Sequence, residues 1–314
     1  MNYQQMKICA SASDMIGQTP LVRLDRLFPD SKARLYAKIE FNNPAGSVKD
    51  RPANAMIVGA EASGLLQKGG HIIEATSGNM GIALAFLSTI KGYRITLTMP
   101  ESMSMERRAL LKRLGATIEL TEASLGMKGA IEKAEELASH LAAWIPKQFE
   151  NLDNVKAHET TTGPEIWADT DGRIDVFVSG VGTGGTITGT MRYLRQQNPM
   201  IESIAVEPAE SPVLSGGDPG PHGIQGIGAG FIPKILDMAM VSRIEKVTTA
   251  EAIDMARKIA ITEGLLTGIS SGAVLAALSR LAYDQSYANK TIVGIIASGG
   301  ERYLSTRLYE DLMS

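Results

Sequence analysis

Cysteine is almost absent from this sequence, because Cys9 is the only one in 314 residues. No disulfide can therefore form within the chain, which fits a reducing compartment. No apolar stretch reaches the roughly 18 residues that a membrane-spanning helix needs. The N-terminus also lacks the basic and apolar regions of a signal peptide. Together these absences predict a cytoplasmic protein with no membrane partner.

Histidine and clustered positive charge are scarce as well. The four histidines are scattered without the His-x-x-x-His spacing of a metal site, so we expect no bound metal. The net charge is −3 and no run of Lys or Arg forms a basic patch, so nucleic acid is not an expected partner. The composition, 44% hydrophobic and 21% charged, is that of a globular protein whose length predicts about two lobes.

Strand patterns alternate with helix patterns along most of the chain. The expected strands lie at 35–40, 71–74, 94–99, 117–120, 175–179, 203–206 and 291–296. The expected helices lie at about 50–63, 78–91, 105–114, 127–143, 156–169, 186–196, 249–263 and 271–282. This alternation predicts two α/β lobes with mostly parallel, twisted sheets flanked by helices. Such sheets bind ligands in the loops that leave the carboxyl ends of their strands.

A glycine-rich loop follows the expected strand at 175–179. Residues 180–186 read Gly-Val-Gly-Thr-Gly-Gly-Thr and open a helix. Glycines let backbone N–H groups approach an anion, and a helix N-terminus adds partial positive charge, so this loop is a candidate phosphate site. The same glycines match a dinucleotide fingerprint, with Glu207 as the candidate ribose-binding acid. A third interpretation is that they only allow tight packing of strand against helix.

Two further loops precede helices. Residues 76–81, Thr-Ser-Gly-Asn-Met-Gly, suit a carboxylate, although a simple helix cap by Thr76 or Ser77 explains them by itself. Residues 268–272, Gly-Ile-Ser-Ser-Gly, offer one serine as a cap and a second for a ligand. Lys49 follows a Pro/Gly turn, and alone it predicts only a solvated charge. Together, Lys49 and the three loops could surround one small phosphorylated cofactor.

Together these motifs resemble the fold type II pyridoxal-phosphate enzymes, and specifically the cysteine synthase (O-acetylserine sulfhydrylase) family. The resemblance is carried by segments 17–21, 43–51, 76–81, 161–166, 180–186, 223–231, 268–272 and 300–306. It implies a fold like that of the tryptophan synthase β subunit. In that fold residues 50–150 would form a smaller mobile lobe, and residues 1–49 with 151–314 a larger lobe that binds the cofactor phosphate.

The resemblance also implies a role for each candidate residue. Lys49 would hold pyridoxal 5'-phosphate as a Schiff base and then act as the base on the substrate α-carbon, which requires a neutral amine. Asn79 would bind the ring oxygen of the cofactor, and Ser270 its pyridine nitrogen. The cofactor phosphate would be bound by Gly182, Thr183, Gly184, Gly185 and Thr186. The substrate carboxylate would be bound by Thr76, Ser77, Gly78, Met80 and Gln148.

The implied reaction is a β-replacement, in which O-acetyl-L-serine loses acetate to leave an aminoacrylate and sulfide then adds to give L-cysteine. The implied protein partners are a second copy, in a homodimer, and the C-terminal tail of serine acetyltransferase. Two alternatives stay open within the family: another nucleophile, as in cystathionine β-synthase, and a weakly active homologue that mainly binds the acetyltransferase. A nicotinamide-dependent dehydrogenase would leave Lys49 and the 76–81 loop without roles.

Three positions depart from the family pattern. Met80 stands where the family has Thr, so a hydroxyl donor gives way to a bulky thioether. Losing one hydrogen bond to a charged group costs roughly 1.5–3 kcal/mol, so we expect weakened or altered substrate use. Residues 297–300 read Ala-Ser-Gly-Gly in place of Pro-Ser-Ser/Asn-Gly, which would loosen the wall beside the cofactor ring. Pro52 replaces an ordinary helix former, in a first turn that tolerates proline.

Overall fold

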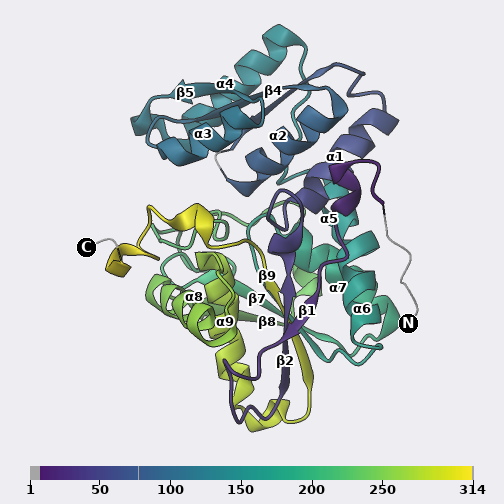
Figure 1. Ribbon diagram of the computed structural model, residues 1–314, viewed down its shortest axis with the longest axis vertical. Coiled ribbons are helices and arrows are strands. Elements are labelled where there is room, and N and C mark those ends of the chain that lie inside the picture. Colours follow the sequence, from purple (N-terminus) through teal and green to yellow (C-terminus); the bar gives the residue numbers. More distant parts are fainter. Residues whose placement is uncertain (1–7, 77, 313–314) are drawn as a thin grey trace.

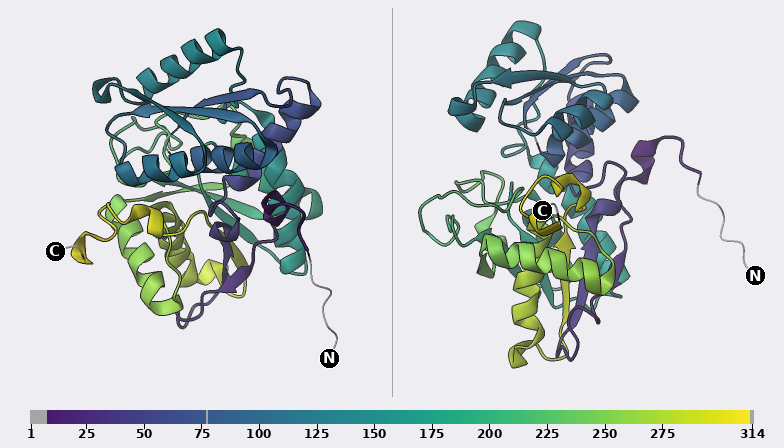
Figure 2. Two further views of the ribbon diagram at one scale, coloured as in Figure 1. Left: turned by 45° about the horizontal axis from the view of Figure 1, so that its top comes forward. Right: turned by 60° about the vertical axis from the view of Figure 1, so that its left-hand side comes forward.

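Two sheets organise the chain in the computed structural model, which describes residues 8–76 and 78–312. The six-stranded sheet has the strand order β1-β2-β9-β6-β7-β8, and the three-stranded sheet has the order β3-β4-β5. Figure 1 shows the smaller sheet with its helices above the larger one, and the two views of Figure 2 show the same two-part arrangement. The predicted α/β fold with two lobes and mostly parallel sheets is confirmed.

The larger sheet lies between two layers of helices. Its strands are β1 (Leu21–Arg23), β2 (Arg34–Ile39), β6 (Val176–Gly180), β7 (Glu202–Pro208), β8 (Arg243–Val247) and β9 (Thr291–Ile296). β1 pairs antiparallel with β2, and the other pairs are parallel. Val176 and Val178 pack with α8 (Thr249–Glu263) and α9 (Ile269–Ala282), whereas Phe177 packs with α7 (Gly185–Gln197). Alternate residues of β6 thus face opposite helix layers, as strand geometry requires.

The smaller sheet has its own hydrophobic core. Its parallel strands are β3 (His71–Ala75), β4 (Arg94–Pro100) and β5 (Thr117–Thr121), and its helices are α1 (Asp50–Ala62), α2 (Asn79–Lys91), α3 (Met105–Arg113) and α4 (Gly126–Leu141). Ile72 and Leu97 pack in one cluster with residues of α1 and α2. Ile73 points to the opposite face, where it contacts the cluster of Ala134 and Ala138 on α4. Helices therefore cover both faces of this sheet too.

Two segments differ from the sequence-based expectation. The helix expected at 156–169 is three pieces: α5 (Leu152–Ala157), the π-helical turn η4 (His158–Thr162) and α6 (Gly163–Asp169). β8 was not expected at all. The remaining short turns are η1 (Ala12–Met15), η2 (Glu40–Asn42), η3 (Ala123–Leu125), η5 (Met238–Met240), η6 (Gln285–Tyr287), η7 (Glu301–Tyr303) and η8 (Glu310–Leu312). Across the described ranges no helix is long and apolar enough to cross a membrane.

Helix starts decide which side chains are available to a ligand. The helix expected at 249–263 begins at Thr249 as predicted, because Thr248 and Glu251 form a capping box at the start of α8. The expected serine cap at 268–272 is wrong, because α9 begins at Ile269 with Gly268 as its N-cap and without a capping side chain. Ser270 and Ser271 therefore lie in the first turn of α9. Ser270 is not needed to cap that helix.

Candidate active site

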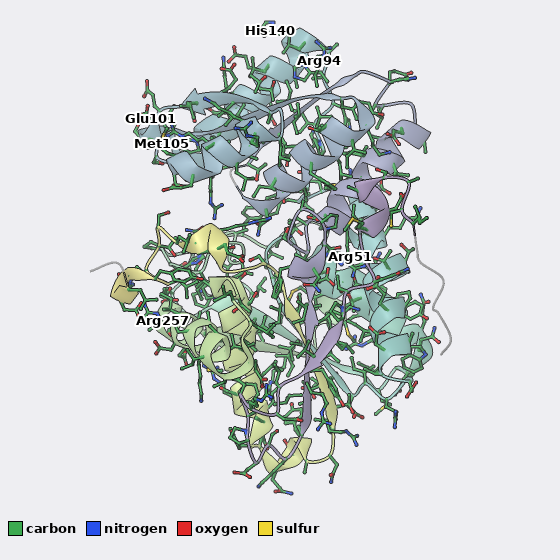
Figure 3. The ribbon with its side chains drawn as sticks, in the orientation of Figure 1. Arg51, Arg94, Glu101, Met105, His140 and Arg257 are labelled. Atoms are coloured by element: carbon green, nitrogen blue, oxygen red, sulfur yellow. The ribbon has the colours of Figure 1, made fainter. Side chains whose placement is uncertain are left out.

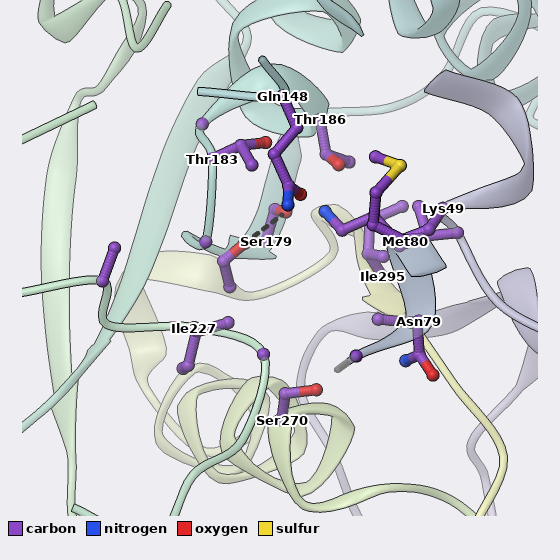
Figure 4. A pocket seen from close by; sticks show the side chains of 18 of the residues that line it. Lys49, Asn79, Met80, Gln148, Ser179, Thr183, Thr186, Ile227, Ser270 and Ile295 are labelled. Carbon is purple, nitrogen blue, oxygen red and sulfur yellow. Dashed lines mark hydrogen bonds between the residues drawn. The ribbon is translucent and has the colours of Figure 1, made fainter. Parts of the chain in front are cut away.

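The three predicted loops and the lysine line one cavity of about 270 Å³. Its walls come from both sheets: the loop before α1, the start of α2, the loop between β6 and α7, and the first turn of α9 (Figure 4). The predicted site residues that line it are Lys49, Thr76, Gly78, Asn79, Met80, Gln148, Gly182, Thr183, Gly184, Thr186 and Ser270. Gly185 does not line the cavity, and Ser77 lies outside the described residues.

Lys49 is the N-cap residue of α1, and its amine points into the cavity (Figure 4). Lys49 is partly exposed where it lines the cavity. Burial lowers the pKa of its amine from 10.5 to about 8, because it disfavours the charged ammonium. A substantial fraction of the amine is thus neutral near pH 8, as required of a nucleophile that attacks an aldehyde.

The loop between β6 and α7 combines backbone N–H groups with two buried threonines. Gly184 is the N-cap of α7 with φ of +83°, a left-handed conformation that favours glycine. The hydroxyl of Thr183 accepts a hydrogen bond from Asn154 Nδ2 at 3.1 Å, and Thr186 Oγ1 lies 3.2 Å from His158 Nε2. A side chain at Gly185 would collide with Asn154. The loop is thus closely packed, and its inner face lies in the same cavity as Lys49.

The loop before α2 forms the opposite wall. The Thr76 hydroxyl accepts a 3.3 Å hydrogen bond from the backbone N–H of Gly78, and Asn79 and Met80 begin the helix. Met80 is only 2% exposed because it lines the cavity and also packs in the core of the smaller sheet. Gln148 contributes its amide from another segment (Figure 4).

Known proteins with the same arrangement identify the family. A family model described as "Pyridoxal-phosphate dependent enzyme" matches residues 12–299. This chain belongs to that family. It is 52% identical to cysteine synthase A of Escherichia coli (strain K12) over 318 residues, which covers 98% of each chain.

Two solved structures show the same fold at high similarity. Cysteine synthase from Entamoeba histolytica has a TM-score of 0.95 and 43% identity, covering 99% of this chain and 93% of that one. O-ureido-L-serine synthase has a TM-score of 0.94 and 40% identity, covering 97% of this chain and 96% of that one. The predicted family, fold type and dependence on pyridoxal phosphate are confirmed.

The residues present fit this cofactor. An aldehyde needs an amine that can lose its proton, and Lys49 lines the cavity with a lowered pKa. A phosphate needs several donors, and the N-terminus of α7 supplies backbone N–H groups beside Thr183 and Thr186. Glycine is required there on steric grounds, because a side chain at Gly182 would clash with the carbonyl of Gly226.

The position of Glu207 contradicts the dinucleotide-binding interpretation. This carboxylate accepts hydrogen bonds from the backbone N–H groups of Leu214 and Ser215, at 2.8 and 3.1 Å, and from the Ser215 hydroxyl. It holds the loop after β7 and does not line the cavity that contains Lys49. The family match excludes the dehydrogenase as well, because it assigns the chain to pyridoxal-phosphate chemistry.

Several buried charged groups around the site were not predicted from the sequence. Arg51, two residues after Lys49, forms ion pairs with Glu40 and Glu165, each at 2.7 Å, and Figure 3 shows where Arg51 lies. Burial opposes ionisation of Glu165, but the hydrogen bonds and charge of Arg51 outweigh it and lower the pKa of Glu165 to about 2. Burial raises the pKa values of Asp50 and Glu74 to about 7. No local sequence pattern marks these groups, because their burial and pairing depend on segments that are far apart in the chain.

Proposed function

We propose that this chain makes L-cysteine from O-acetyl-L-serine and sulfide by a β-replacement that releases acetate. The observation that carries the proposal is the cavity itself, where a lysine with a lowered pKa lies between the glycine-rich loop at 180–186 and the loop before α2. Relatives over 98% of the chain are cysteine synthases. When bound, pyridoxal phosphate withdraws electrons from the substrate α-carbon and so makes its proton removable.

The residues around the cavity have separate roles that follow from their positions. Lys49 anchors the cofactor and then takes the α-proton of the substrate, acting as the general base. Gly182 to Thr186 bind the cofactor phosphate, with Gly185 supporting the loop, and Asn79 and Ser270 bind the ring. Ser270 is a neutral partner, so the ring stays a moderate electron sink that suits elimination of acetate.

The substrate carboxylate binds to the loop before α2, through Thr76, Ser77, Gly78 and the backbone of Met80, and through Gln148. Residues 50–150 form a mobile lobe that closes over the carboxylate and excludes water, while residues 1–49 and 151–314 form the larger lobe. The protein works in the cytoplasm as a homodimer, and its cavity accepts the C-terminal tail of a serine acetyltransferase. The curated relatives at 50–52% identity are cysteine synthases, and this favours cysteine formation over the cystathionine β-synthase-like alternative and over the weakly active binding protein.

Spectroscopic titration tests the proposal directly. The purified holoenzyme is expected to show the visible absorbance band of lysine-bound pyridoxal phosphate. Adding O-acetylserine should shift the band and release one acetate per site, and sulfide should then restore the spectrum and yield cysteine. The Lys49→Ala variant is the matched control and should show neither the band nor acetate release. A wild-type spectrum that does not respond to O-acetylserine would refute this substrate.

A further inference from the structure

Arg302 reaches the cavity's wall from a distant part of the chain. It lies on η7, the turn between β9 and the C-terminal segment, and its guanidinium Nη1 donates a 2.8 Å hydrogen bond to Oδ1 of Asn79. Its Nη2 donates to the carbonyl oxygen of Ala45, in the turn that leads to Lys49. One side chain therefore joins the start of α2 to the loop that carries the lysine.

We propose that Arg302 is a positioning residue that fixes the amide of Asn79 with its nitrogen toward the cofactor. A guanidinium has only donors, so it can bind the amide oxygen and never the amide nitrogen. With Oδ1 occupied by Arg302, Nδ2 is the group left for the cavity. In Figure 4 the nitrogen of Asn79 lies on the side nearer Ser270, and the oxygen points away. The inference rests on the proposed role of Asn79 as the partner of the cofactor's ring oxygen.

The surroundings of Arg302 hold it in place. The next residue, Tyr303, is 2% exposed, and its hydroxyl lies 3.0 Å from Oγ of Ser298, two residues after β9. Gly46 has φ of +78°, and a side chain there would meet the guanidinium of Arg302. The turn before Lys49 is thus shaped around this arginine. Arg302 itself does not line the cavity, so it acts through Asn79 and the Ala45 carbonyl.

The expected effect follows from the chemistry of the ring oxygen. A donor stabilises the oxygen's anionic form, and loss of that donor favours the protonated form. Without Arg302 the amide of Asn79 can rotate, so its oxygen faces the cavity for part of the time. The visible band of the bound cofactor should therefore lose intensity to a band in the near ultraviolet. The value of kcat/KM should fall about three- to tenfold, the effect of one neutral hydrogen bond.

The test compares the spectra of holoenzyme variants. Arg302→Met keeps an apolar stem but has no donor, and Arg302→Ala is the second variant should the first not fold. Arg302→Lys, another side chain with donors only, is expected to recover most of the visible band. The double variant with Asn79→Ala should show no more spectral change than Asn79→Ala alone, because both substitutions remove the same interaction.

Arg257→Ala is the matched structural control. Arg257, labelled in Figure 3, holds the same C-terminal segment through the carbonyls of Arg307 and Leu308, at 2.7 and 2.9 Å, and does not line the cavity. It should lower stability and leave the spectrum unchanged. A wild-type spectrum in Arg302→Met, or spectral effects of Arg302 and Asn79 that add, would overturn the inference. Failure of the proposed function looks different, since the wild-type spectrum would then not respond to O-acetylserine, whatever the spectrum of Arg302→Met.

Discussion

Met80→Thr should change substrate binding and stability in opposite directions, and the two effects can be measured separately. Met80 lines the cavity at the start of α2, beside the loop that we assign to the substrate carboxylate. A threonine would place a hydroxyl donor at the same position. One added hydrogen bond to a charged group contributes roughly 1.5–3 kcal/mol, so we expect KM for O-acetylserine to fall about ten- to a hundredfold.

The same change should weaken the smaller lobe. Met80 is 2% exposed and packs in that lobe's core, and truncating a buried methionine costs about 2–5 kcal/mol. Urea unfolding should therefore show a lower midpoint for Met80→Thr than for the wild type. Better substrate binding and lower stability in one variant would show that the methionine serves the core at the expense of the site.

Met80→Leu is the matched control, because leucine keeps the apolar volume and supplies no hydroxyl. Steady-state kinetics should give it the KM of the wild type and a nearly unchanged unfolding midpoint. The reasoning is refuted if the threonine and leucine variants have the same KM, since the hydroxyl would then make no contact with substrate.

Three further predictions concern buried charges. Because the pKa of Lys49 is about 8, the rate at which apoprotein binds pyridoxal phosphate should rise about tenfold per pH unit up to pH 8 and then level off; a flat profile by visible absorbance would contradict this. Glu74 has a pKa of about 7 in the folded state against an ordinary 4.5, so between these pH values the folded state binds a proton that the unfolded state has lost. The free energy of unfolding should therefore fall by about 3 kcal/mol as the pH rises from 4.5 to 7. Glu74→Gln should remove that part of the pH dependence in urea unfolding at pH 5 and 7.5, and an unchanged difference would show that Glu74 is not its source. Arg51→Met should destabilise the protein by about 3–5 kcal/mol by leaving the buried Glu40 without its ion-pair partner, and a shift below 1 kcal/mol would show that water reaches that carboxylate.

The sequence predicts the fold well wherever a local pattern is strong. Hydrophobic periodicity and glycine-rich loops locate most strands and helices, and the capping box of Thr248 marks the start of α8 to the residue. β8 was missed because its sequence, Arg-Ile-Glu-Lys-Val, is short and three of its five residues are charged. It becomes a strand by pairing with β7 at the sheet edge, and that tertiary contact leaves no local signal.

In the candidate site, too, residues in a local motif could be predicted and residues that act through distant contacts could not. Lys49, the loop after β6 and the loop before α2 each carry a motif, and the structure brings them into one cavity. Arg302 contacts Asn79 across 223 positions of the sequence, so no spacing or periodicity connects them. The segment at 300–306 carried a resemblance without a role for any of its residues. Its role became visible only when hydrogen-bond partners could be identified.

The buried ion pairs of Arg51 restrict how this protein can diverge. Glu40 and Glu165 pair with the same guanidinium, and Glu165 also pairs with the buried Lys38 at 3.0 Å. Replacing Arg51 leaves Glu40 as an unpaired charge in the interior, which removes a large part of the protein's marginal stability. Substitutions of Arg51 should therefore persist in descendants of this enzyme only where Glu40 changes with it.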